Sequence, residues 1–329
     1  MTIPALDPTE LAWATTKLND LIAGFDAVVV GQPRLRTALL TTLLARGHVL
    51  LESVPGLAKT LAASTLARAV AGSFARIQCT PDLLPSDIIG TEVFDPATTR
   101  FRTELGPVHS NFVLLDEINR SSAKTQSAML EAMQERQTSI GGVTHALPDP
   151  FLVLATQNPI EEEGTYVLPQ AQMDRFLLKE VIDYPTAEAE LEVLNRVESG
   201  VFDVAEPAIA SINDVLRLQR ICAAVHVDET LKRYMVELVN VTRRPSSYLD
   251  GDQARWIEFG ASPRGTIAFM QVARAAALLA GRDHALPDDI VGMRHAVLRH
   301  RLVLTFEAVA ERVSVENLID AVFKAVPTP

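Results

Sequence analysis

Three runs of apolar residues, each followed directly by polar residues, stand out in the first half of the chain. They are "HVLLES" (48–53), "FVLLDE" (112–117) and "FLVLATQN" (151–158). A continuous apolar run of this length is typical of a strand that is buried on both faces of a parallel sheet. We therefore expect three strands of one sheet, with their polar ends at the same edge.

The segments between these runs have the periodicity of helices. In "SSAKTQSAMLEAMQER" (121–136), Ser121 or Ser122 is a plausible N-cap before an apolar stripe. Further helices are expected at 7–25, 33–46 and 59–70. Strands that alternate with helices of this length indicate an α/β domain with a mainly parallel sheet.

Two short segments have the pattern of hairpins. Near 94–101, Asp95-Pro96 separates two extended runs, and near 138–146, Gly141-Gly142 does the same. Both hairpins are expected to project from the core.

The pattern changes at about residue 186, after which the chain is almost entirely helical in periodicity. Long amphipathic stretches lie near 211–224, 228–242, 263–281 and 287–301. We therefore predict an α/β domain over residues 1–186 and an all-helical domain over 187–329.

Composition narrows the possible functions. The 329 residues carry a net charge of −11, with 48% hydrophobic and 22% charged residues. This acidic balance makes nucleic acid an unexpected partner, and no long apolar run predicts membrane insertion. The N-terminus does not have the pattern of a signal peptide, and the two cysteines form no C-x-x-C pair. A cytoplasmic location is expected.

The segment "LESVPGLAKT" (51–60) departs from the phosphate-loop pattern G-x-x-x-x-G-K-[ST] at two positions. Ser53 and Ala58 replace the glycines, but Lys59 and Thr60 are present. A strand–turn–helix context turns backbone N–H groups toward an anion, with the lysine reaching the β- and γ-phosphates and the hydroxyl ligating Mg²⁺. The context is met, which favours phosphate binding over an ordinary turn.

The two substitutions predict different costs. Ala58 is expected where the chain enters the helix, in a helical conformation that alanine adopts without strain. Ser53 would cost about 1–2 kcal/mol if the loop required a positive φ there. That is a loss of about tenfold in affinity, so the loop is altered but still functional.

Polar residues at the other strand ends complete a hydrolytic site. Asp116 would hold Mg²⁺ directly or through water, and Glu117 would act as the base for the attacking water. Asn158, at the same sheet edge, is a candidate to orient that water.

Together these segments resemble the MoxR family of AAA+ ATPases. The resemblance is dense over 30–176, in "VGQ", "GHVLLESVPGLAKT", "RIQCTPDLLPSDIIGT", "LLDEINRSSAKTQSAMLEAMQERQ" and "FLVLATQNPIEEEGTYVLPQAQMDRF", and continues through "GASPRG". It implies a P-loop α/β fold with a doubly wound, mainly parallel sheet, followed by an all-α helical lid. ATP or ADP and Mg²⁺ are the implied cofactors.

The resemblance also implies roles for single residues. Arg175 in "QMDRF" is similar to an arginine finger that reaches a neighbouring subunit's nucleotide, and Arg264 in "SPRG" to a sensor-2 arginine. Gln170 replaces the family's usual glutamate, in what would be a polar contact near a subunit boundary. The hairpins would be the helix-2 insert and the pre-sensor-1 hairpin. The nucleotide-binding residues would be Val30, Gly31, Gln32, Ser53, Val54, Pro55, Gly56, Leu57, Ala58, Lys59, Thr60 and Asp116.

The leading hypothesis is an ATPase that acts as a ring, with a hexamer expected, and remodels partner proteins. The resemblance suggests a chaperone-like role, often with a partner that has a von Willebrand factor A domain. Two alternatives are an ATP-dependent scaffold that hydrolyses weakly and, less favoured, a DNA translocase. The basic segment "RHAVLRHRL" (294–302) is expected to form a solvated or interface face, with contact to nucleic acid or a neighbour's phosphates less favoured.

Overall fold

The computed structural model describes residues 6–54, 56–159, 166, 168–198 and 207–329. The chain forms two compact units, and each of them is assembled from separate segments. The sheet unit comprises Lys17–Leu168 and Glu180–Arg217, and the helical unit comprises Met1–Thr16, Pro169–Lys179 and Leu218–Pro329. The boundary expected between residues 186 and 187 stays a prediction.

A five-stranded sheet with the order β2-β5-β8-β1-β9 organises the α/β part of the chain. Its strands are β1 (Val49–Glu52), β2 (Phe74–Gln78), β5 (Phe112–Asp116), β8 (Leu152–Gln157) and β9 (Leu178–Val181). β2 pairs with β5, β5 with β8, and β8 with β1, all in parallel. The three apolar runs are the interior strands, which confirms that prediction. The edge strands β2 and β9 were not predicted from the sequence.

Helices follow the strands as the alternating pattern predicted. They are α1 (Pro8–Val28), α2 (Pro33–Leu44), α3 (Lys59–Ala69) and α5 (Ala123–Glu135), with the shorter α4 (Pro85–Ile89), η1 (Pro107–His109) and η2 (Ile118–Arg120). α3 packs against β2 and β5, and α2 packs against β1. Ser122 is the N-cap of α5, because its side chain accepts a hydrogen bond from the backbone N–H of Thr125.

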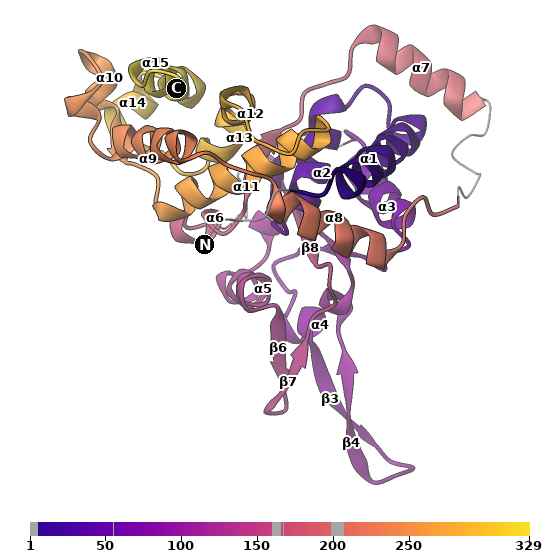
Figure 1. The fold of residues 1–329 in the computed structure, drawn as a ribbon. Coiled ribbons are helices and arrows are strands. Elements are labelled where there is room, and N and C mark those ends of the chain that lie inside the picture. Colours follow the sequence, from indigo (N-terminus) through magenta and orange to yellow (C-terminus); the bar gives the residue numbers. More distant parts are fainter. Residues whose placement is uncertain (1–5, 55, 160–165, 167, 199–206) are drawn as a thin grey trace. The chain divides into compact units, whose positions relative to one another are not determined.

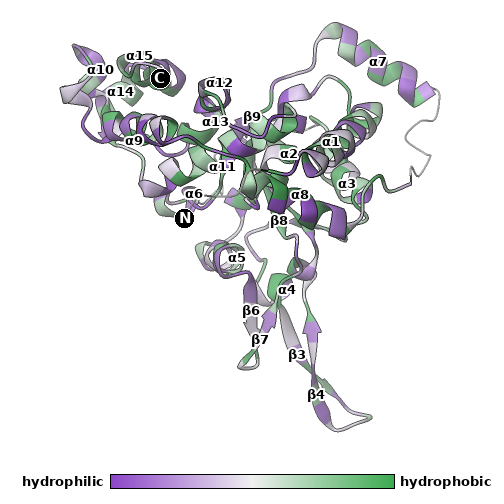
Figure 2. Ribbon diagram, in the orientation of Figure 1, coloured by the Kyte–Doolittle hydropathy of each residue, from purple (hydrophilic) through white to green (hydrophobic). Residues whose placement is uncertain are grey.

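Two antiparallel hairpins project from the sheet unit next to each other (Figure 1). One is formed by β3 (Gly90–Asp95) and β4 (Arg100–Leu105), the other by β6 (Gln137–Ile140) and β7 (Val143–Ala146). Gly141 and Gly142 connect β6 to β7 with φ angles of +56° and +81°, which glycine adopts without a steric penalty. Both predicted hairpins are confirmed, and both carry hydrophilic stretches (Figure 2).

The second half of the chain is mainly helical, as predicted. Its helices are α6 (Gln170–Met173), α7 (Ala187–Glu198), α8 (Ile212–Ala224), α9 (Glu229–Arg243), η4 (Pro245–Ser247), α10 (Asp252–Arg255), α11 (Pro263–Leu279), α12 (Pro287–Val291), α13 (Arg294–Leu298), α14 (Phe306–Ala310) and α15 (Val315–Ala325). A short antiparallel pair, β10 (Ile257–Phe259) and β11 (Val303–Leu304), interrupts them.

The single helix expected over 287–301 is wrong, because the chain breaks there into α12 and α13. Met293, between them, has φ −109° and ψ 8°, outside the helical range. The Arg294 side chain donates to the carbonyl of Val291 at 2.8 Å, so the last carbonyl of α12 has a partner without a continuing helix.

The core of the sheet unit lies on the interior strands. Phe112, Val113, Leu114 and Leu115 of β5 are all fully buried. No helix in the part of the chain that the structure describes combines the length and apolar character needed to cross a membrane.

Candidate functional site

The loop between β1 and α3 has its backbone strain at a position that the sequence analysis did not expect. Ala58, the N-cap of α3, has φ 53° and ψ 20°, a left-handed conformation that L-residues rarely adopt. The expectation of a strain-free helical Ala58 is therefore wrong. Ser53, by contrast, is not among the described residues with a positive φ, so the cost considered for it does not arise. Pro55 lies outside the described residues.

Lys59 begins α3 and turns its ammonium group back into the loop. It donates to the Ser53 hydroxyl at 2.7 Å and to the Val54 carbonyl at 3.2 Å. Burial lowers the pKa of Lys59 from its ordinary value, and the nearby carboxylates of Asp116 and Glu117 oppose that shift. The lysine and the two carboxylates are thus close enough to interact.

Asp116 ends β5 with both of its carboxylate oxygens occupied. Oδ1 accepts a hydrogen bond from the Thr156 hydroxyl at 2.9 Å, and Oδ2 lies 2.5 Å from Nη2 of Arg76. The Thr156 hydroxyl also accepts the backbone N–H of Glu117 at 2.8 Å. Thr156 is fully buried and holds the two acidic residues together, a role that the sequence analysis missed.

Glu117 extends from a second left-handed backbone position, with φ 57° and ψ 55°. Its Oε2 accepts hydrogen bonds from Gln78 Nε2 at 3.2 Å and from Arg120 Nη1 at 3.3 Å. Gln78 and Arg76 lie on β2, which the sequence analysis did not identify as a strand. Asn158 follows β8 and is only 6% exposed.

A cavity of about 470 Å³ lies beside the loop, within the sheet unit. Its lining includes five of the residues expected to bind nucleotide: Val30, Gln32, Gly56, Leu57 and Ala58. The rest of the lining was not predicted from the sequence and consists of Tyr184, Pro185, Glu190, Val193 and Leu194. The neighbouring apolar residues Val193 and Leu194 of α7 were the only sequence feature that could have indicated this part of the lining. A mainly apolar cavity next to a phosphate loop suits a purine base.

Gly31 explains how α7 approaches this cavity. It has φ +71°, and a Cβ at this position would lie 2.6 Å from the Cβ of Ala189 on α7. A larger residue would therefore be strained in its backbone and would push α7 away from the "VGQ" turn.

The donor set at the sheet edge fits a magnesium ion shared with substrate phosphates. Mg²⁺ prefers hard oxygen ligands and needs only one or two from the protein when phosphates supply others. Asp116 offers a carboxylate and Thr60 a hydroxyl. Arg76, the cation that now pairs with Asp116, is about half exposed and so has room to give way. No group of three or more histidine, cysteine or acidic side chains that could hold a metal occurs among the described residues.

Arg175 and Arg264 both belong to the helical unit. Arg264 lies in the first turn of α11, and its backbone N–H donates to the Ser262 hydroxyl at 3.0 Å. The Nε of Arg175 is buried and meets no hydrogen-bond acceptor among the described residues. Gln170 donates from Nε2 to the carbonyl of His300 at 2.8 Å, which an ionised glutamate could not do.

The basic segment 294–302 is internal, which corrects the expectation of a solvated or interface face. Arg299 and Arg301 have side chains only 7% and 2% exposed, and pair with Glu316 and Asp174. Arg294 pairs with Asp320. Charges neutralised within the fold provide no patch for nucleic acid.

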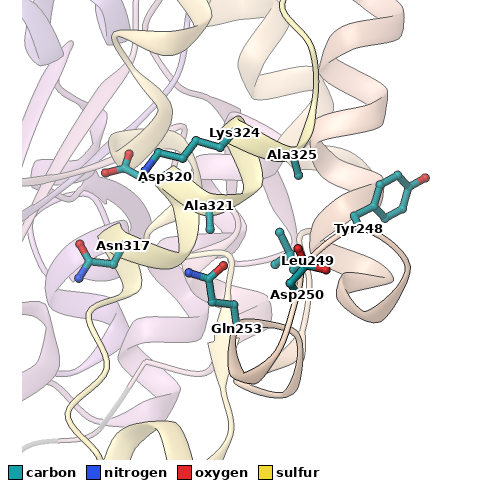
Figure 3. A pocket seen from close by; sticks show the side chains of 9 residues that line it. All are labelled: Tyr248, Leu249, Asp250, Gln253, Asn317, Asp320, Ala321, Lys324 and Ala325. Carbon is teal, nitrogen blue, oxygen red and sulfur yellow. The ribbon is translucent and has the colours of Figure 1, made fainter.

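The helical unit also has a polar hollow of about 510 Å³ between η4–α10 and α15 (Figure 3). It is lined by Tyr248, Leu249, Asp250, Gln253, Asn317, Asp320, Ala321, Lys324 and Ala325. None of these is a predicted site residue, and Asp320 is already paired with Arg294 and His295.

Comparison with known proteins agrees with the geometry. Residues 48–178 match the family described as "ATPase family associated with various cellular activities (AAA)", and residues 252–322 match the AAA lid domain. The chain is 51% identical to "Chaperone MoxR1" of Mycobacterium tuberculosis, over 92% of this chain and 80% of that protein. It is 35% identical to "Protein MoxR" of Paracoccus denitrificans, over 95% and 96% of the two chains.

A crystal structure of a candidate ATPase from Cytophaga hutchinsonii has the same fold. The TM-score is 0.93 at 45% identity, and the match covers 98% of this chain and 97% of that one. The α/β domain and helical lid implied by the sequence are thereby confirmed. The chain belongs to the MoxR family of AAA+ ATPases.

Proposed function

We propose that this chain hydrolyses ATP at the carboxyl edge of its parallel sheet. One observation carries the proposal: the loop that holds Lys59 borders a cavity that suits a purine base, and Thr156 holds Asp116 and Glu117 together at the strand ends of the same sheet. Ligands of open α/β sheets bind at this edge. The residues also agree with an ATPase family whose profile matches the chain.

The nucleotide is bound in two parts. Val30 and Gln32 line the base cavity, with Gly31 between them in the chain, and the backbone of the loop over 53–58 faces the phosphates. When the nucleotide binds, the Lys59 side chain leaves the Ser53 hydroxyl, and its ammonium group donates to the β- and γ-phosphates instead. Thr60 and Asp116 would hold Mg²⁺, which when bound neutralises charge on the phosphate oxygens.

Hydrolysis needs a base and a means of stabilising charge. Glu117 accepts the proton of the attacking water, and Asn158 orients that water. Arg175 of one subunit reaches the γ-phosphate in the next, and Arg264 contacts phosphate from the lid. A finger supplied by a neighbour makes turnover depend on assembly.

The same proposal extends to a ring, expected to be a hexamer, that remodels or activates partner protein complexes in the cytoplasm. The name of the M. tuberculosis relative, a chaperone, supports this role. The buried free cysteines Cys79 and Cys222 agree with a reducing compartment. A partner with a von Willebrand factor A domain is proposed by analogy only, because a fold does not determine a client.

Steady-state turnover tests the proposal across a range of protein concentrations, with Glu117→Gln beside the wild type. We expect turnover per subunit to rise with concentration and to fall at least about 100-fold in Glu117→Gln, because general base catalysis contributes about 10²–10⁴-fold. Both proteins should bind ATP equally well. Wild-type turnover no faster than that of Glu117→Gln would leave an ATP-dependent scaffold.

A client is best sought with the same variant. Glu117→Gln in ATP should retain a partner that the wild type releases after hydrolysis. The control is Lys59→Ala in ATP, which should lack the nucleotide-bound state and retain nothing.

A further inference from the structure

Arg301 is a buried cation that has no role in the proposed nucleotide site. Its side chain is 2% exposed, and its Nε donates to Asp174 Oδ1 at 2.8 Å. The two terminal nitrogens donate to main-chain carbonyls, Nη2 to Phe176 at 2.7 Å and Nη1 to Leu177 at 3.1 Å. The planar fork of arginine suits this set of acceptors, and lysine could not span them.

These contacts lie on both sides of Arg175 in the sequence. The residue before it, Asp174, is held through its carboxylate, and the residue after it, Phe176, through its carbonyl. His300 adds a second hydrogen bond to the Phe176 carbonyl, at 3.0 Å. Phe176 itself is fully buried. The backbone of Arg175 is therefore fixed from both directions, while its own Nε stays unpaired among the described residues.

The second oxygen of Asp174 connects this segment to α11. Oδ2 accepts a hydrogen bond from the Ser262 hydroxyl at 2.6 Å. Ser262 is the N-cap of α11, and its hydroxyl accepts the backbone N–H of Arg264 at 3.0 Å. One carboxylate thus ties together the two segments that carry Arg175 and Arg264.

The charges support the same arrangement. Burial lowers the pKa of Arg301 to about 10, and Asp174 opposes that shift, so the guanidinium stays charged at neutral pH. A buried pair of this kind stabilises a fold weakly compared with an apolar replacement, but it specifies one arrangement of its partners when every donor is satisfied. Its use here is better explained by the arginines that it orients.

We propose that Asp174 and Arg301 are positioning residues for ATP hydrolysis, which hold the Arg175 and Arg264 segments in one fixed arrangement without touching the nucleotide. This inference rests on the proposed function, because it assigns the two arginines to phosphate. Beyond the proposed function, it states that the Asp174–Arg301 pair fixes the positions of both Arg175 and Arg264, and that separate local contacts do not.

Asp174→Asn tests the inference, since asparagine keeps the shape and removes the charge. A matched control is Asp289→Asn, which breaks another pair of a buried aspartate in the helical unit: Asp289 is 8% exposed and accepts from Arg282, itself 26% exposed, at 2.6 and 2.9 Å. We expect Asp174→Asn to lower kcat about 10- to 100-fold with KM and nucleotide affinity changed less than about threefold, as small misplacements of charged groups do. Asp289→Asn should leave kcat unchanged.

Two further measurements separate positioning from a general structural role. In a background of Arg175→Ala, Asp174→Asn should lower kcat by a smaller factor than in the wild type, because one of the two arginines that it positions is already missing. Hydrogen exchange without nucleotide should speed up at the amides of residues 174–177, 262, 264 and 265 in Asp174→Asn, and not in Asp289→Asn. Arg301→Lys keeps the charge without the fork, and should resemble Asp174→Asn.

The outcomes are distinct. A wild type that turns over no faster than Glu117→Gln rejects the proposed function, and the exchange comparison then decides whether Asp174 joins the two segments. Normal turnover in Asp174→Asn, an equal loss in the Arg175→Ala background, or unchanged exchange would overturn the positioning role.

Discussion

Two aspartate–arginine pairs show how the two units use the same chemistry differently. Asp116 pairs with Arg76 in the sheet unit, and Asp174 pairs with Arg301 in the helical unit. Both aspartates have side chains that are 14% exposed, and each also accepts a hydrogen bond from a hydroxyl group. The arginines differ in exposure: the side chain of Arg76 is 49% exposed, whereas the side chain of Arg301 is 2% exposed.

This difference in exposure separates a replaceable partner from a permanent one. Water can solvate Arg76 when it leaves, so a bound cation can take its place at Asp116 at little cost. Water does not reach the Arg301 side chain, so breaking its pair with Asp174 would leave unpaired charges in the interior of the helical unit. An aspartate with an exposed arginine therefore suits a ligand site, and one with a buried arginine suits a fixed support.

Of the changes considered, Asp116→Asn, in the pair with the replaceable Arg76, should lower ATP turnover the most. Asparagine retains the acceptor for Thr156 but loses the charge that would attract Mg²⁺. We expect turnover at a fixed magnesium concentration to fall about 100-fold, with part of the loss recovered at high magnesium, because hard cations bind carboxylate far better than amide oxygen. Magnesium titrations of turnover and of nucleotide affinity measure it.

Asp149→Asn is the matched control in the sheet unit. Asp149 pairs with Arg46 through both oxygens, but both side chains are nearly half exposed and lie outside the cavity lining. Its loss should leave the magnesium titration unchanged. An Asp116→Asn titration that overlays the wild type would place the metal elsewhere and remove the contrast between the two pairs.

Acid should destabilise the sheet unit through His48. Burial lowers the pKa of this imidazole to about 3, and the Arg136 charge adds to the shift. Its Nδ1 accepts the N–H of Val153 and its Nε2 donates to the Met133 carbonyl, so the neutral ring is the one that fits. The unfolded chain, with an ordinary pKa near 6.5, binds the proton first as pH falls.

The folding free energy from this group is therefore fully present at pH 7 and is lost as pH falls from about 6.5 to about 3. At pH 5 the loss is about 2 kcal/mol. Hydrogen exchange along β8 between pH 7 and 5, corrected for the intrinsic rate, measures it, and His48→Gln should flatten the dependence. His300, whose pKa is also lowered by burial, provides the comparison in the helical unit. A pH dependence that survives in His48→Gln would assign the effect to another group.

The interior of the sheet was predictable from the sequence and its edges were not. β1, β5 and β8 are buried on both faces, so their sequences are unbroken apolar runs. In β2, at one edge, only Ile77 is buried, and β9, at the other edge, has only four residues. Missing β2 meant missing Arg76 and Gln78 as partners of the acidic residues, because their place follows from strand pairing.

The site shows the same division. Lys59, Asp116 and Glu117 follow from local motifs, since each comes directly after a recognisable strand or turn. The role of Arg301 depends on a contact across 127 positions of sequence, which no local pattern encodes. The backbone angles of the loop were also misjudged, because an alanine in a left-handed conformation has no signature in the sequence.

The smallest expected effects concern the two missing glycines, and they should differ in kind. Ser53→Gly removes the hydroxyl that binds the Lys59 ammonium at 2.7 Å, without relieving any backbone strain. A hydrogen bond to a charged group contributes about 1.5–3 kcal/mol. In the wild type the Lys59–Ser53 bond must break before Lys59 can bind phosphate. Without the hydroxyl part of that cost disappears, and ATP binding should tighten about fivefold. Equilibrium binding to Glu117→Gln with and without Ser53→Gly measures this effect.

Ala58→Gly instead relieves a positive φ of 53°. It should stabilise the sheet unit by about 1 kcal/mol in thermal unfolding. Ala71→Gly is the matched control, because Ala71 also has a positive φ, of 52°, but lies outside the lining of the cavity. Both alanine variants should gain stability to a similar extent, while ATP affinity should stay near the wild-type value in Ala71→Gly.

If Ser53→Gly weakened binding, the hydroxyl would be helping to present Lys59 to the phosphates, and the exchange of partners proposed for this lysine would be wrong.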